Sequence, residues 1–193
     1  PTLMYNKSEK EIRDAVTLLI GCASLYFNFP VPTIALINGH CMAAGAVFAI
    51  YSDYRYMVDK GGRIGFSEAL VGLNFPSAPT MVLRDLVGTN KTRDLLYGGK
   101  QLKGPEAKEI GLVDEVYPIE SLFSEGMKLA MSLSKLTYNS ARGMKTAQRS
   151  FYKPIHETIT KEDIDYFVTT IQSTDGQEGF LSLIEKRRPK FVT

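Results

Sequence analysis

The segment from Pro32 to Glu68 constrains the fold of this chain more than any other part of it. It opens with a β-rich apolar run, Thr33 to Ile37, which ends at the turn-forming pair Asn38-Gly39. Small residues at 43–46 and apolar residues at 47–51 then predict a buried helix. The first N–H groups of a helix have no internal partner, and small side chains let a ligand approach them. We therefore expect this helix to present backbone donors to a ligand.

One carboxylate follows this segment at a notable place. A second predicted strand, 54–58, and the short run 63–67 lead to Glu68, which has apolar residues on both sides. Apolar surroundings raise the pKa of a carboxyl group toward the range that suits a general base. Donors for an oxyanion and one base together predict a proton-transfer site. The alternatives are a surface glutamate at 68 and, for the small residues, a tight contact between helix and sheet.

Four segments resemble one protein family. NGHCMAAGAVFAIYSDYRYM (38–57) is similar to the crotonase (enoyl-CoA hydratase/isomerase) superfamily pattern N-G-x-x-x-G-G-G-x-x-L-A-x-x-x-D, and IGFSEALVGL (64–73) to its pattern F-x-x-P/S-E-x-x-x-G. The likeness continues through GPEAKEIGLVDEVYP (104–118) and QEGFLSLIEKRRPKF (177–191). It thus covers essentially the whole chain, and several motifs in the right order make it specific.

The resemblance implies a role for several residues. The backbone N–H of Ala44, where the family usually has glycine, supplies half of an oxyanion hole for a thioester carbonyl, and Gly45 is the neighbouring candidate. Glu68 matches the second of two glutamates used by the hydratases, whereas Val47 stands at the position of the first. From their order along the chain, Asn74 and Phe75 are expected to line the acyl pocket. Two residues near the C-terminus, Phe180 and Lys186, are expected to approach bound CoA.

One remaining carboxylate can shuttle a proton but is poorly equipped to orient water. The pattern resembles the Δ3,Δ2-enoyl-CoA isomerases of fatty-acid β-oxidation, which convert 3-enoyl-CoA to 2-trans-enoyl-CoA with no metal or redox cofactor. CoA then enters as part of the substrate. Two alternatives stay open: a hydratase or other crotonase reaction that takes a second acid from elsewhere, and a non-catalytic scaffold that binds acyl-CoA.

The order of predicted elements indicates an α/β core followed by helices. Ser8 and Glu11 predict a capping box that starts a helix running to about Tyr26. Its buried face is expected to include leucines 18, 19 and 25. Strands alternate with helices to about residue 118, so we divide the chain into a partial core, 1–118, and a helical region, 119–193. The resemblance implies a spiral of ββα units whose opening strands, with the second oxyanion donor, are absent from this sequence.

Residues outside these motifs carry further expectations. Met127, with Leu129 and Leu133, is expected in the core, Asp53 is expected to cap or pair locally, and His40 to be structural. An apolar stripe near the C-terminus could fold back over the core of its own chain. The resemblance implies instead contacts between subunits, in a homotrimer or a dimer of trimers. The stripe contains Ile164, Phe167, Val168, Ile171, Phe180, Leu181 and Ile184.

Composition and charge exclude several classes of protein. With 193 residues, 44% apolar and 23% charged, the chain has a globular composition. A net charge of +2 and the lack of basic residues interleaved with aromatic ones predict no nucleic-acid partner. No apolar run reaches the roughly 20 residues that span a bilayer. Cys22 and Cys41 fit neither metal nor disulfide spacing, which predicts a reducing compartment. The resemblance implies the mitochondrial or peroxisomal matrix, although no targeting signal is visible.

Overall fold

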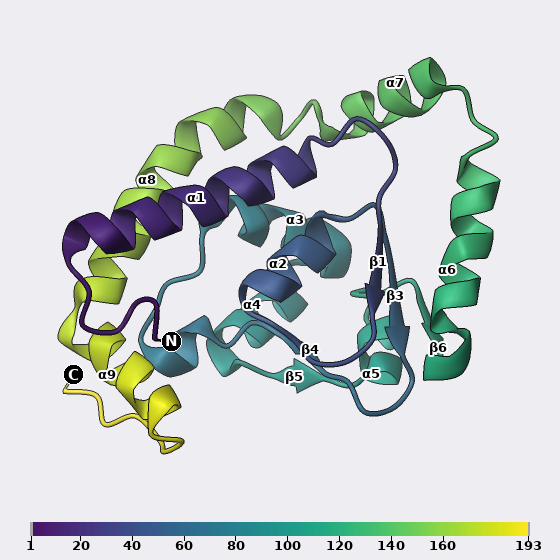
Figure 1. Ribbon diagram of the computed structural model, residues 1–193. Coiled ribbons are helices and arrows are strands. Elements are labelled where there is room, and N and C mark those ends of the chain that lie inside the picture. Colours follow the sequence, from purple (N-terminus) through teal and green to yellow (C-terminus); the bar gives the residue numbers. More distant parts are fainter. Residues whose placement is uncertain (1, 193) are drawn as a thin grey trace.

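The computed structural model describes residues 2–192, including their side chains except at 153–160. Two small three-stranded sheets lie among the helices (Figure 1). The first is parallel, in the order β1 (Ile34–Ile37), β3 (Tyr54–Val58), β6 (Glu115–Tyr117). The second has the order β2 (Cys41–Met42), β4 (Ile64–Gly65), β5 (Gln101–Leu102), with β2 parallel and β5 antiparallel to β4.

Helices surround both sheets and then continue alone. The first is α1 (Glu9–Phe27), and the helices between the strands are α2 (Ala44–Tyr51), α3 (Ser77–Val87), α4 (Thr89–Gly98) and α5 (Gly104–Glu109). After β6 come α6 (Ile119–Leu133), α7 (Tyr138–Arg149), α8 (Lys153–Gln172) and α9 (Thr174–Ile184). The predicted change from alternating elements to helices near residue 118 is therefore confirmed. The later helices still contact the earlier part, since α6 packs on β1 and β3, and α8 on α1 and α3.

The first helix begins as predicted but buries a different face. The Ser8 hydroxyl accepts a hydrogen bond from the Glu11 N–H, and the Glu11 carboxylate accepts one from the Ser8 N–H. The prediction for the buried face was wrong at two of its three leucines, because Leu18 and Leu25 are 69% and 75% exposed, whereas Leu19 is half-buried. The side chains that the helix buries recur at spacings of four and seven residues on another side, facing α2 and α8. They are Ile12, Val16, Ala23 and Phe27.

Two clusters of buried side chains make the core. The larger surrounds α2 and the parallel sheet, and the smaller joins α1, α8 and α9 to the segment after Glu68. Three members of the C-terminal stripe, Val168, Ile171 and Phe180, are buried in the smaller cluster. This part of the stripe therefore folds back over its own chain. The expected trimer stays a prediction that no contact in the structure tests.

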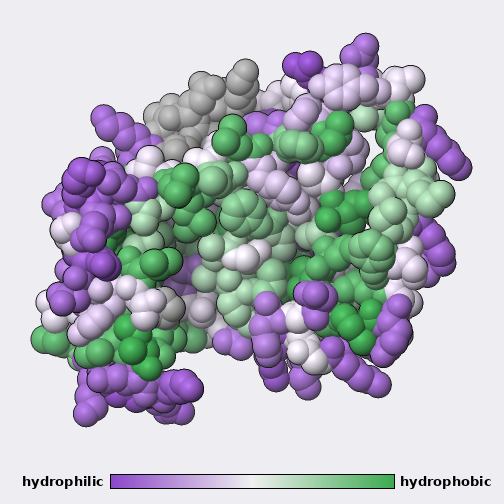
Figure 2. Space-filling model, in the orientation of Figure 1, coloured by the Kyte–Doolittle hydropathy of each residue, from purple (hydrophilic) through white to green (hydrophobic). Residues whose placement is uncertain are grey.

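Helix α6 leaves apolar side chains on the surface. It packs through Leu122 and Gly126, and a Cβ on Gly126 would lie 2.6 Å from the Leu36 side chain. Met127 is 45% exposed, so its expected place in the core was wrong. Figure 2 shows the apolar side chains that remain exposed on this side of the molecule. Helical spacing alone did not reveal which face of α6 meets the sheet.

Candidate active site

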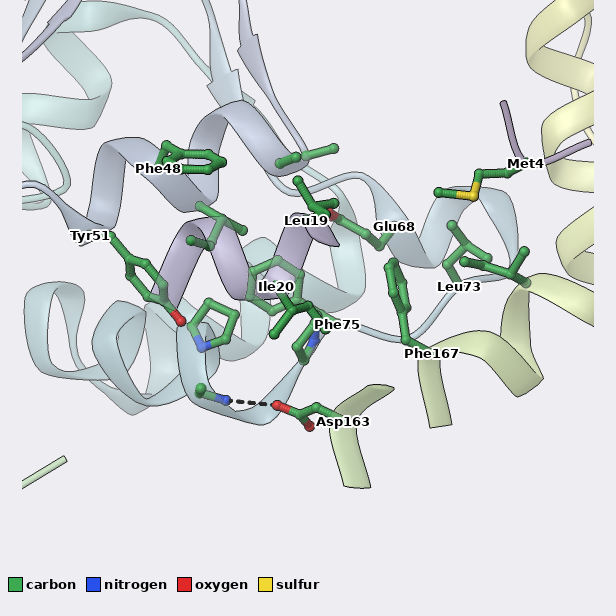
Figure 3. Close-up of a pocket in the computed structure, with 18 of the residues that line it drawn as sticks. Met4, Leu19, Ile20, Phe48, Tyr51, Glu68, Leu73, Phe75, Asp163 and Phe167 are labelled. Carbon is green, nitrogen blue, oxygen red and sulfur yellow. Dashed lines mark hydrogen bonds between the residues drawn. The ribbon is translucent and has the colours of Figure 1, made fainter. Parts of the chain in front are cut away.

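An apolar cavity of about 200 Å³ lies where α1, α2, α3, α8 and α9 meet the turn that carries Glu68 (Figure 3). Leu19 and Ile20 line it from α1, and Val47 lines it from α2. Two aromatic side chains, Phe75 and Phe167, add further apolar surface. Such walls suit an acyl chain, because burying apolar surface is the main favourable term in binding.

The N-terminus of α2 faces this cavity through Ala43 and Ala44, which both line it. Ala43, the residue before the helix, has φ 51° and ψ −124°, and no side chain caps the helix. A positive φ is rare for alanine and costs about 1–3 kcal/mol, and such strain is concentrated at functional sites. Ala44 has the ordinary negative φ of a helix start. Its N–H belongs to the first turn, where a helix offers unpaired donors to an anion.

Glu68 begins the short 3-10 helix η1 (Glu68–Val71), directly after buried β4 and Phe66. The turn ends at Gly72, whose φ of 71° favours glycine. Helix α9 lies against it, and a Cβ added to Gly179 would be 2.0 Å from the Val71 carbonyl oxygen. Glycine at this position lets α9 hold the turn closely. The backbone that carries Glu68 is thus fixed from both sides.

The carboxylate of Glu68 is buried and only partly satisfied. The residue is 8% exposed, and its Oε2 atom has no hydrogen-bond partner among the described residues. Burial raises the pKa of Glu68 to about 7, although the N–H groups of Glu68 and Ser67 pull the pKa down to a lesser extent. A carboxyl group with a free oxygen and a pKa near neutrality can both take up and return a proton.

The structure brings together part of the predicted site. Ala44, Glu68, Phe75 and Phe180 line the cavity. Gly45, Asn74 and Lys186 are not among the described residues that do so.

Each of these three residues has other surroundings. Gly45 lines a groove beside β1 on the other side of α2. Asn74 Oδ1 accepts a hydrogen bond from the Thr170 hydroxyl at 2.8 Å. Lys186 is exposed beyond the end of α9. The cavity therefore gives no support to Gly45 as the oxyanion donor, to Asn74 as a residue of the acyl pocket or to Lys186 as a contact of CoA.

Sequence reasoning missed a second carboxylate in the cavity wall, that of Asp163 on α8. It is 6% exposed and accepts hydrogen bonds from the N–H groups of Ser77 and Ala78 at 2.8–3.2 Å. No local pattern could have revealed it, because its partners lie 85 and 86 residues earlier in the chain.

Asp53 and His40 also have definite surroundings. The expected local pairing of Asp53 is incomplete, since its carboxylate binds Lys145 at 2.6 Å and Arg149 at 2.7 Å, both on α7, besides nearby Thr33. His40 is exposed in the turn before β2. Among the residues whose side chains the structure describes, 2–152 and 161–192, no three His, Cys, Asp or Glu side chains converge as metal ligands would. The same residues contain no helix long and apolar enough to cross a membrane.

A helix N-terminus and a buried carboxyl group with a pKa near neutrality face one apolar cavity, which is the arrangement expected of a proton-transfer site. The family model described as enoyl-CoA hydratase/isomerase matches residues 5–193, so the chain belongs to this family. The resemblance seen in the sequence is thereby confirmed.

Known relatives differ in their named reactions. The chain is 31% identical over 171 residues to the enoyl-CoA hydratase domain-containing protein 3, mitochondrial, of Mus musculus, over 84% of this chain and 53% of that protein. It is 40% identical over 88 residues to the enoyl-CoA delta isomerase 2, peroxisomal, of Arabidopsis thaliana, over 45% of this chain and 37% of that protein. The chain spans about half the length of the mouse relative.

A solved structure confirms the fold. The human mitochondrial delta3-delta2-enoyl-CoA isomerase matches with a TM-score of 0.91 at 22% identity, over 96% of this chain and 72% of that chain. The likeness shows the crotonase fold, as the sequence predicted.

Proposed function

We propose that this chain carries the activity of a Δ3,Δ2-enoyl-CoA isomerase of fatty-acid β-oxidation. The observation that carries the proposal is which of the carboxylates around the cavity still has an oxygen without a hydrogen-bond partner. Glu68 has a free oxygen and a pKa near neutrality, while Val47 on the facing helix is aliphatic. Asp163 already uses both of its oxygens as acceptors from α3. The site therefore has one carboxylate that is free to move a proton.

The reaction needs only this carboxylate and an oxyanion donor. Glu68 removes a proton from C2 of the 3-enoyl thioester, and the electrons of the C–H bond move into a dienolate. The negative oxygen of this dienolate accepts a hydrogen bond from the Ala44 N–H. The protonated Glu68 then returns the proton to C4. The double bond shifts from C3–C4 to C2–C3, and base and donor end in their starting states. The apolar walls keep competing water away from the dienolate.

A hydratase is the second candidate, and Asp163 is the observation in its favour. Adding water to 2-trans-enoyl-CoA requires a base for the water and an acid for C2, and Asp163 is a second acid in the cavity wall. Figure 3 shows it across the cavity from Glu68, with its oxygens directed to α3. A scaffold that binds acyl-CoA without turnover is the remaining alternative, because alanine stands at position 44, where the family usually has glycine.

Location and assembly are part of the proposal. The names of the relatives place one in mitochondria and one in peroxisomes, which supports one of these two matrices for this chain. A homotrimer or a dimer of trimers remains our prediction. Light scattering of the purified protein at micromolar concentration tests it, and a monomer would contradict it.

Two assays on one preparation test the function. Isomerisation of 3-trans-enoyl-CoA and hydration of 2-trans-enoyl-CoA are measured side by side, and isomerisation is expected to be faster by more than about tenfold in kcat/KM. Comparable rates would favour the hydratase. Tight binding of a saturated acyl-CoA in calorimetry, with neither reaction detected, would favour the scaffold.

A further inference from the structure

Asp163 occupies a distinctive position in the cavity. Its side chain enters from α8, is almost fully buried, and lies on the opposite side of the cavity from Glu68 (Figure 3). The Ser77 N–H donates to Oδ1 at 2.9 Å and to Oδ2 at 2.8 Å, and the Ala78 N–H donates to Oδ2 at 3.2 Å. Both carboxylate oxygens of Asp163 thus accept hydrogen bonds from the N-terminus of α3.

Helix α3 depends on this long-range contact for its cap. The first N–H groups of a helix need acceptors from outside it. The residue before α3 is Pro76, which has no side-chain acceptor to offer. Asp163 therefore performs the task of an N-cap side chain from a different helix. An amide in its place would keep only one acceptor oxygen and would lose the negative charge that favours a helix N-terminus.

The contact joins two walls of the acyl cavity. Ala78 and Pro79 line it from α3, and Phe167 and Ile171 line it from α8. Holding the start of α3 against α8 therefore fixes the spacing between these walls.

A polar group closes the same end of the cavity. Tyr51 and Asp163 both line the cavity, and burial raises the pKa of the Tyr51 hydroxyl, with a smaller contribution in the same direction from the negative charge of Asp163. Tyr51 also lies away from Glu68 in Figure 3. An acyl chain that extended past this end would displace the carboxylate from its donors, which is unfavourable for a buried charge.

The size of the cavity sets the length of the chain that fits. An engineered protein cavity of about 150 Å³ holds benzene, with its six carbons. By the same measure, the cavity of about 200 Å³ has room for roughly eight carbons.

We propose that Asp163 is the residue that determines the chain-length specificity of this site. By tying α8 to the first turn of α3, it closes the end of the cavity opposite Glu68 and limits the acyl group to medium length. It acts as a positioning residue, because it works through the helix walls. This inference rests on the proposed function in taking an acyl-CoA as the ligand.

The test compares Asp163→Asn with Glu162→Gln across chain lengths. Glu162 precedes Asp163 on α8 and is exposed, so its variant is the same acid-to-amide change without the contact to α3. Kd is measured by calorimetry for butanoyl-, octanoyl- and hexadecanoyl-CoA below their micelle concentrations. For the matching 3-enoyl-CoAs, kcat and KM are measured separately.

The wild type is expected to prefer the octanoyl over the hexadecanoyl compound by about tenfold or more. In Asp163→Asn this preference should fall by about fivefold or more, mainly through KM, whereas Glu162→Gln should keep it. If Asp163→Asn does not fold, Asp163→Glu carries the test, because it keeps the charge and both acceptor oxygens while its extra methylene changes the distance between α8 and the start of α3. A wild type without length preference, or an unchanged preference in the folded variant used, would overturn the proposal. Length-dependent binding without turnover would count against the isomerase alone.

Discussion

Glu68 and Asp53 are both acidic side chains withdrawn from water, and the structure treats them in opposite ways. Glu68 is 8% exposed and keeps one oxygen without a partner among the described residues. The Asp53 side chain is 17% exposed, but its oxygens accept from Lys145 and Arg149, and from the N–H of Thr33 at 2.7 Å. The Glu68 carboxyl group is left without a cation, and the Asp53 carboxylate is paired with two cations.

The difference separates a chemical role from a structural one. Lys145 also donates to the carbonyl of Val31 at 2.8 Å, and Arg149 donates to that of Tyr51 at 2.9 Å. The Arg149 guanidinium lies 4.1 Å from the centre of the Phe27 ring. Asp53 therefore joins α7 to the end of α1 and to the segments around β1 and β3. Burial alone does not identify a functional carboxylate. A buried carboxylate that has no positively charged partner is a far better candidate.

Removing the base should give the largest effect. Glu68→Gln is expected to lower kcat for isomerisation by about 10² to 10⁴-fold, the usual contribution of a general base. Glutamine has the same shape but cannot take up a proton. The control is Glu109→Gln, an exposed glutamate on α5, which should retain the wild-type rate. Near-full activity of Glu68→Gln would refute the assignment of the base.

Breaking the Asp53 cluster should instead reduce stability. Asp53→Asn is expected to lower the free energy of unfolding by about 3–5 kcal/mol, because the buried Lys145 and the partly buried Arg149 lose their counter-ion. Urea unfolding measures this loss, and the rate per folded molecule should be unchanged. Asp14→Asn, which breaks only an exposed pair with Lys10, should cost less than about 1 kcal/mol. Equal losses in the two variants would remove the contrast between Asp53 and a surface acid.

Ionised Glu68 should reduce the stability of the folded protein, whereas Asp53 should increase it. The pKa of Glu68 rises from 4.5 to about 7 on folding, so the folded protein holds this proton more tightly than the unfolded chain. Stability is therefore highest below about pH 4.5 for this group and is lost as the pH rises through 7, by about 3 kcal/mol in total. At pH 8, Glu68→Gln should be more stable than the wild type by up to this amount. Chemical denaturation at pH 4 and pH 8 checks it, and the gain should vanish at pH 4.

The pH dependence of the rate should show the smallest of these effects. Only ionised Glu68 can remove the C2 proton, so kcat/KM should rise about tenfold from pH 6 to pH 8, with a midpoint near the pKa of about 7. Initial rates at low substrate concentration measure it across this range. A flat profile between pH 5 and pH 8 would place the pKa of the base elsewhere.

The sequence by itself determined the local features of this protein. The run from strand to turn to small-residue helix predicted the N-terminus of α2 at Ala44, and the spacing to the next motif singled out Glu68. Ser8 and Glu11 predicted the start of α1, because a capping box involves residues only three apart. The family motifs were equally readable, since each is a short run of neighbouring residues.

Only the tertiary structure decided which surfaces are covered and which charges are paired. Ile12 and Leu18 are similar apolar residues on one helix, and the position of α8 buries the first and leaves the second exposed. Asp53 and Asp163 differ from other acids by partners 85 to 96 residues away in the chain. Helix starts and turns depend on neighbours in sequence, whereas burial and ion pairing depend on segments that meet only when the chain is folded.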